Sequence, residues 1–95
     1  ISKTENGYTK LPNGLIIQWG LSSSVAHDGL TSVTFPIAFP MDCLRVIAVK
    51  QNSTKNNDDS WAVVRDFSKT GADFRMEGSG DQSGTRYVAY LAIGY

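Results

Sequence analysis

The sequence is poor in the residues from which catalytic and metal sites are built. Histidine occurs once, at His27, and cysteine once, at Cys43, among 95 residues. One histidine and one cysteine cannot form a four-ligand zinc site within a single chain. A lone cysteine also forms no intrachain disulfide, which is typical of proteins assembled in a reducing cytoplasm. Nine basic residues balance nine acidic ones without any basic run, so the charge pattern does not favour nucleic-acid binding.

Long apolar runs and helical periodicity are also missing. No apolar stretch approaches the roughly 20 residues that cross a bilayer, and residues 1–6 lack the apolar core of a signal peptide. Because the sequence starts at Ile1, we expect it to be part of a longer chain. No segment of ten or more residues places apolar side chains at helical spacing.

Short strand signals recur instead, separated by clusters of Gly, Asn, Asp and Ser. Pro36 interrupts one of them, which predicts an edge strand or a bulge. The predicted strands are residues 15–19, 32–39, 43–50, 61–67, 73–77 and 86–95, and the predicted loops are 22–29, 51–60 and 78–84. This spacing predicts an all-β fold, a small antiparallel β-sandwich, in residues 13–95. Residues 1–12 are expected to be a linker or strand arm from an upstream region.

The last predicted strand is apolar on both faces. One face carries Tyr87, Ala89, Leu91, Ile93 and Tyr95, and the other carries Val88, Tyr90 and Ala92. A strand of an open antiparallel sheet normally has one polar face. We therefore expect a partner subunit to cover one side of this strand. A domain of this size has a modest core, so oligomerisation is a natural further source of stability.

Catalytic constellations are weak. Ser23, His27 and Asp28 lie in one loop, where neighbours rarely reach triad geometry, and no nucleophile-elbow motif accompanies them. Cys43 at a strand start indicates a buried structural thiol. Asp58 and Asp59 are acidic loop residues that could also ligate calcium. Asp66, Asp73 and Glu77 could form a hydrolytic pair, but nothing in the sequence places two of them together. We expect no enzyme, no metal and no cofactor.

A binding function is better supplied with side chains. Trp61 follows the polar segment 51–60, so its ring either belongs to the core or lies at the base of a loop. Aromatic rings beside amides and carboxylates are a common means of holding sugars. Arg75 could reach an anionic group or pair with a nearby carboxylate. The candidate receptor residues are Asn52, Asn56, Asn57, Asp58, Asp59, Trp61, Arg75, Arg86 and His27.

Three segments together carry a family resemblance. They are NGYTKLPNGLIIQWG at residues 6–20, VTFPIAFP at residues 33–40 and YLAIGY at residues 90–95. In combination they resemble the C-terminal domain of tailed-phage tail fibres, in the gp53-like family also found in Mu-like prophages and phage-tail-like bacteriocins. The region between residues 51 and 86 carries no matching motif.

The resemblance implies a homotrimeric tip, intertwined or side by side, at the distal end of a fibre. Such a tip binds a host surface glycan such as lipopolysaccharide and is not an enzyme. It joins an upstream fibre shaft, is made in the host cytoplasm and ends in the virion, and some relatives need a fibre-assembly chaperone. The expected core and trimer scaffold comprises Trp19, Phe35, Phe39, Tyr90, Leu91, Ile93 and Tyr95.

Four alternatives stay open at this point. The domain could be a trimerisation cap without a receptor site, or a self-cleaving folding chaperone at the fibre end. It could be a small glycan hydrolase, or, as a monomer, a stand-alone carbohydrate-binding sandwich.

Overall fold

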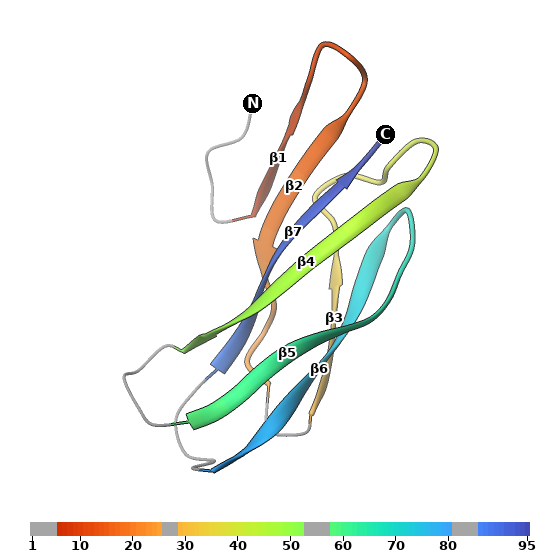
Figure 1. Cartoon of the computed structure of the whole chain (residues 1–95). Helices are drawn as coiled ribbons and strands as arrows, with labels where there is room; N and C mark the ends of the chain where they lie inside the picture. Colours follow the sequence, from red (N-terminus) through yellow and green to blue (C-terminus); the bar gives the residue numbers. More distant parts are fainter. Residues whose placement is uncertain (1–5, 26–28, 53–57, 81–85) are drawn as a thin grey trace.

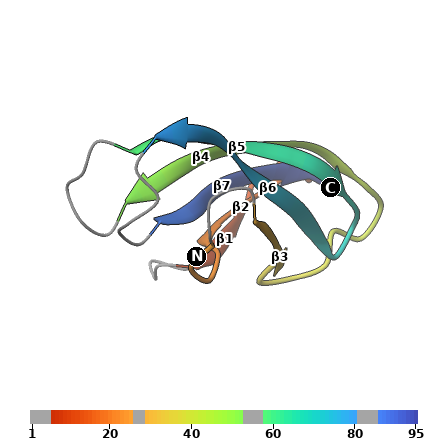
Figure 2. The same ribbon diagram turned by 90° about the horizontal axis from the view of Figure 1, so that it is seen from below.

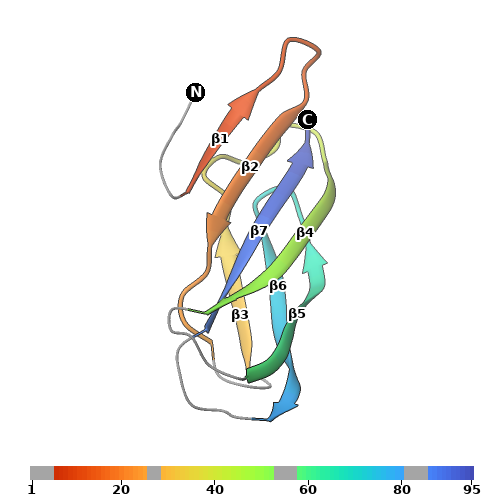
Figure 3. The same ribbon diagram turned by 60° about the vertical axis from the view of Figure 1, so that its left-hand side comes forward.

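The computed structural model describes residues 6–25, 29–52, 58–80 and 86–95, which form seven strands in two antiparallel sheets (Figures 1 and 3). The four-stranded sheet has the order β1-β2-β7-β4 and the three-stranded sheet the order β3-β6-β5. The strands are β1 (Gly7–Lys10), β2 (Ile16–Leu21), β3 (Leu30–Thr34), β4 (Cys43–Asn52), β5 (Asp58–Phe67), β6 (Gly71–Gly80) and β7 (Arg86–Gly94). The predicted all-β antiparallel fold is confirmed.

The segment 1–12, expected to be a linker or strand arm, includes β1, which pairs with β2 from Gly7↔Trp19 to Lys10↔Ile16. Several other predicted boundaries are wrong. Residues 51–52, 58–60 and 78–80, which the sequence places in loops, continue β4, β5 and β6. Their backbone pairing, such as Asn52↔Arg86 and Asp58↔Gly80, extends the ladders without needing apolar side chains.

The predicted strand 32–39 is shorter than expected. β3 ends at Thr34, and Pro36 lies beyond it, outside any strand. β3 is an edge strand of its sheet, as the presence of Pro36 predicted. The bulges lie in β4, between Cys43 and Arg45, and in β5, between Val64 and Asp66.

The core lies between the two sheets. Phe74 and Met76 of β6 face Val88, Tyr90 and Ala92 of β7, and these side chains are buried. Rings from the segment after β3 close one end of the core, with Phe35 at 5.3 Å from Phe39 and 5.7 Å from Tyr90 between ring centroids. Phe35 and Phe39, the aromatic residues of the segment 33–40, are therefore core residues that lie outside any strand.

A buried glutamine holds this segment in place. Gln18 of β2 is fully buried, and its side-chain amide donates to the carbonyl of Ile37 at 2.8 Å. Its carbonyl oxygen accepts from the Ile37 N–H at 3.0 Å. Gln18 thus satisfies both backbone polar groups of Ile37 in a stretch that no strand pairs with.

Candidate functional site

The outer face of the four-stranded sheet is apolar. Strand alternation and register place three cross-strand rows on it, namely Ile17–Ile93–Arg45, Trp19–Leu91–Ile47 and Leu21–Ala89–Val49. Ile47 is 62% exposed, Val49 57% and Leu91 45%. We call the eight residues of these rows other than Arg45 the outer apolar face. Its extent across three strands exceeds the scattered apolar residues that are normal on protein surfaces.

The expected scaffold residues fall into two groups. Phe35, Phe39 and Tyr90 lie in the core, and burial raises the pKa of the Tyr90 hydroxyl. Trp19, Leu91 and Ile93 lie on the outer apolar face. Tyr95 is exposed beyond β7, where its backbone bonds to Met41 and Asp42. Both faces of β7 are thus apolar, as its sequence predicted, and the described residues of this chain cover the inner one.

The outer face of the three-stranded sheet has a different chemistry. Trp61 of β5 is 56% exposed and lies directly opposite Glu77 of β6. Arg75, two residues before Glu77 on the same strand, forms an ion pair with it. The sequence nominated Trp61 and Arg75 but left the arginine's partner open, and the structure assigns Glu77. An exposed indole therefore lies beside a charged pair that offers both donors and an acceptor.

The strand ends that flank the three predicted loops lie at one end of the molecule (Figures 1 and 2). Register joins Asn52 to Arg86 and Asp58 to Gly80. The N–H of Val25 donates to the carbonyl of Arg86 at 3.0 Å, and the N–H of Met76 donates to that of Gly29 at 2.9 Å. Segments far apart in the sequence therefore begin and end together at this end.

The individual receptor candidates have different outcomes. Asn52, Asp58 and Asp59 belong to the ends of β4 and β5 rather than to a loop. His27, Asn56 and Asn57 lie outside the described residues. Arg86 was predicted to contact the receptor, but the residue is only 2% exposed. It is therefore not available on the surface of this chain for such a contact.

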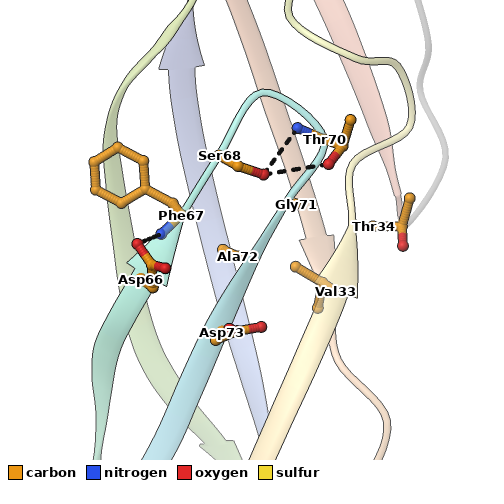
Figure 4. A pocket seen from close by; sticks show the side chains of 9 residues that line it. All are labelled: Val33, Thr34, Asp66, Phe67, Ser68, Thr70, Gly71, Ala72 and Asp73. Atoms are coloured by element: carbon orange, nitrogen blue, oxygen red, sulfur yellow. Dashed lines mark hydrogen bonds between the residues drawn. The ribbon is translucent and has the colours of Figure 1, made fainter.

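A cavity of about 220 Å³ lies at the opposite end of the three-stranded sheet (Figure 4). The β5–β6 turn and the adjoining strand ends form it, with Val33, Thr34, Asp66, Phe67, Ser68, Thr70, Gly71, Ala72 and Asp73 as its lining. Asp66 and Asp73 are directly opposite each other on β5 and β6. The sequence could not place any two carboxylates together, and the bulge in β5 does so here.

A second cavity, of about 500 Å³, opens between β2 and β3. Its lining includes Tyr90 together with the hydroxyl-bearing residues Ser22, Ser32 and Thr34. The Ser22 hydroxyl makes hydrogen bonds within the domain, because its Oγ accepts from the Val88 N–H at 2.9 Å and donates to the Ser23 carbonyl at 2.8 Å.

The described part of the chain holds no group of three or more His, Cys, Asp or Glu side chains placed to bind a metal ion. No helix in it is long and apolar enough to cross a membrane. Cys43 is buried, and burial together with the neighbouring Asp42 carboxylate raises the pKa of its thiol.

Comparison with known proteins decides the family. The family model for the C-terminal region of gp53-like tail fiber proteins matches residues 10–95. The chain belongs to the gp53-like tail fibre family. It is a tail fibre C-terminal domain of the kind found in phages and pyocins, and so a component of a virion or a phage-tail-like particle.

Solved structures agree with this family assignment. An N-truncated R1-type pyocin tail fiber is 27% identical and superposes with a TM-score of 0.86, over 99% of this chain and 83% of that one. A longer R1 pyocin fiber of P. aeruginosa gives the same identity and TM-score, but this gp53-like domain spans only 27% of it. An N-truncated R2-type pyocin tail fiber gives a TM-score of 0.80 and 27% identity, over 99% of this chain and 36% of that one.

One curated relative also matches. An uncharacterized protein of Methanocaldococcus jannaschii is 32% identical over 99 residues, which cover 98% of this chain and 65% of that protein. The gp53-like domain thus spans slightly less than two thirds of this relative, and only about a quarter of the longer pyocin fibre.

Proposed function

We propose that this domain is the receptor-binding tip of a tail fibre, that it forms a homotrimer, and that it holds a host surface glycan such as lipopolysaccharide without cleaving it. The observation that carries this proposal is the contrast between the two outer faces. One is an apolar surface suited to self-association, and the other presents Trp61 beside the Arg75–Glu77 pair.

The outer apolar face supports the trimer. The row Trp19–Leu91–Ile47 crosses three adjacent strands without a charged side chain. Three copies arranged about an axis would remove such a surface from water, at about 25 cal/mol per Å² of apolar area. A trimer also fits a fibre end, because the upstream shaft would deliver three chains together.

The opposite face supports glycan binding. A sugar ring can lay its C–H surface on the exposed indole of Trp61, while Arg75 donates to hydroxyls and Glu77 accepts from them. One millimolar contact corresponds to about −4 kcal/mol. Three copies on one tip, and several fibres on one particle, would convert such weak contacts into firm adhesion.

The trimer is tested by placing a charge on each outer face in turn. Leu91→Glu introduces a carboxylate at the centre of the outer apolar face and is expected to give a folded monomer by light scattering. Leu30→Glu is the matched control, because Leu30 is 60% exposed on the outer face of the other sheet. That variant is expected to remain trimeric. A wild-type protein that is monomeric at all concentrations would contradict the trimer and favour a stand-alone sugar-binding sandwich.

The receptor face is tested by competition for bacteria. An excess of the isolated trimer is expected to block adsorption of the parent particle, and Trp61→Ala is expected to abolish this block. Met41→Ala is the control, because it also removes a large exposed apolar side chain, at a position whose backbone N–H donates to the carbonyl of Tyr95, away from Trp61. Binding that survives Trp61→Ala would show that another surface holds the receptor.

The same experiment separates the proposal from a purely structural role. The outer apolar face alone would suffice for a trimerisation cap, and such a cap would assemble fully but never compete for cells. Incubation with lipopolysaccharide and an assay for new reducing ends tests the absence of cleavage. Release of reducing ends that disappears in Asp66→Asn would instead indicate a hydrolase.

A further inference from the structure

The cavity at the β5–β6 turn lies in the same sheet as Trp61. We propose that it is a second sugar subsite, which receives a neutral, hydroxyl-rich unit further along the same glycan chain. This inference rests on the proposed glycan-binding function. It adds to that function the chemical class of one unit and the direction in which the chain lies.

The polar groups of the cavity suit hydroxyl ligands (Figure 4). Ser68 Oγ and Thr70 Oγ1 lie 3.2 Å apart, and each hydroxyl can both donate and accept. Asp66 accepts from the N–H of Phe67 at 2.9 Å, and Asp73 accepts from Ser32 Oγ at 2.7 Å. Because an ionised carboxylate has about four acceptor positions, each retains capacity for the hydroxyl of a ligand.

A glycine at the start of β6 fixes one wall of the cavity. Gly71 pairs with Thr34 and is one of the lining residues. A Cβ at this position would collide with the carbonyl oxygen of Val33. The close approach of β3 to β6, whose ends both line the cavity, therefore requires glycine here.

The charge of the cavity favours a neutral unit over an anionic one. Asp66 and Asp73 are cross-strand neighbours that both line the cavity, although the Asp73 carboxylate turns towards β3, where it accepts from Ser32 Oγ. A phosphate or a uronate in the cavity would add a third negative charge near these two, and like charges at such positions repel. A neutral sugar can instead donate a hydroxyl proton to either carboxylate, and hydrogen bonds to charged groups are stronger than those between neutral groups.

The cavity and Trp61 are aligned on one face of the sheet. Asp73, Arg75 and Glu77 are two residues apart along β6 and therefore share one face of the sheet. Glu77 lies opposite Trp61. The four residues from Glu77 to Asp73 correspond to about 13 Å of strand. This span exceeds one sugar ring and suits a short linear oligosaccharide that lies along β6 from the indole to the cavity.

The test compares oligosaccharides of increasing length, released from the lipopolysaccharide of a bacterium that the intact trimer binds. Calorimetry is performed on wild type, on Trp61→Ala and on the double variant Thr70→Val with Asp73→Asn. We expect the double variant to bind long neutral fragments about tenfold more weakly and single sugars unchanged. Trp61→Ala is expected to weaken both. Lys69→Gln is the control, because Lys69 lies in the same turn but does not line the cavity.

Each outcome has one meaning. If wild type binds no fragment of any length, both the proposed glycan-binding function and this inference are refuted. If Trp61→Ala weakens binding but the double variant binds long fragments as wild type does, only the second subsite is refuted. A preference of wild type for phosphate- or uronate-bearing long fragments overturns the charge argument. Should the double variant unfold, Ser68→Ala alone is expected to give a smaller loss in the same direction, and unchanged binding to it would count equally against the subsite.

Discussion

Replacing Gln18 by methionine should destabilise the domain strongly without touching either outer face. Methionine keeps an unbranched side chain of similar length but loses both hydrogen bonds to Ile37, of 2.8 and 3.0 Å. A buried backbone group left without a partner costs about 1–3 kcal/mol. Because Ile37 is half-buried and water reaches it in part, we expect the lower part of this range for each group, about 2–4 kcal/mol in total.

The assay is thermal unfolding followed by circular dichroism. A domain of this size loses roughly 4–8 °C in Tm per kcal/mol, so we expect a fall of at least about 8 °C. Protein concentration has to be equal in all samples, because assembly makes Tm concentration-dependent.

Gln51→Met is the matched control for this prediction. It makes the same chemical change at an exposed position in β4, where substitutions typically change stability by less than about 0.5 kcal/mol. If Gln18→Met unfolds at the wild-type temperature, the segment after β3 does not depend on this clamp. The reasoning from buried unsatisfied groups would then be refuted.

Three further predictions concern packing, pH and a buried charge. Gly94→Ala should cost about 1–3 kcal/mol in urea titrations, since its Cβ would lie 2.7 Å from a core ring atom. Gly14→Ala should also destabilise the domain, in this case through backbone strain alone, because its φ is 92° although its Cβ would meet open space. Burial raises the pKa of the Cys43 thiol above its ordinary value of 9.0 and that of the Tyr90 hydroxyl above 10.0, so their stabilising contribution should be complete below pH 9 and lost as pH rises through the higher folded-state pKa values; a Tm that stays constant through this range would contradict it. Arg86→Ala should lower Tm before it affects cell binding, because the side chain is buried, and normal stability with lost binding would reverse this assignment.

Short apolar runs between turn clusters account for what the sequence could predict of the fold. β2, β4 and β7 carry apolar side chains on both faces, so each is recognised as a short run rich in apolar residues rather than by alternation. Whether residues 1–12 form a linker or a strand arm stayed open, because the four residues of β1 carry no apolar alternation. Its existence depends on register with β2, such as Tyr8↔Gln18, and pairing with a distant partner is not a local property of the sequence.

The candidate site was predictable to a smaller degree. Trp61 and Arg75 could be nominated by residue type, but their alignment with Glu77 depends on the β5–β6 register. The burial of Arg86 could not be predicted, because both faces of β7 are apolar in the sequence and its parity with Val88 and Tyr90 does not tell which face the core covers. The opposition of Asp66 and Asp73 was also out of reach, since it follows from a bulge in β5.

The position of β7 in its sheet has a consequence for biosynthesis. This strand comes last in the sequence yet lies between β2 and β4, which do not pair with each other. While a ribosome has made only the preceding residues, β2 and β4 have no common neighbour, and the four-stranded sheet cannot form. Residues 86–94 also supply the centre of the outer apolar face, in Leu91 and Ile93. A chain interrupted before this segment would therefore lack both its own sheet and the centre of the surface proposed to join sister chains, so folding and assembly would both await the synthesis of residues 86–94.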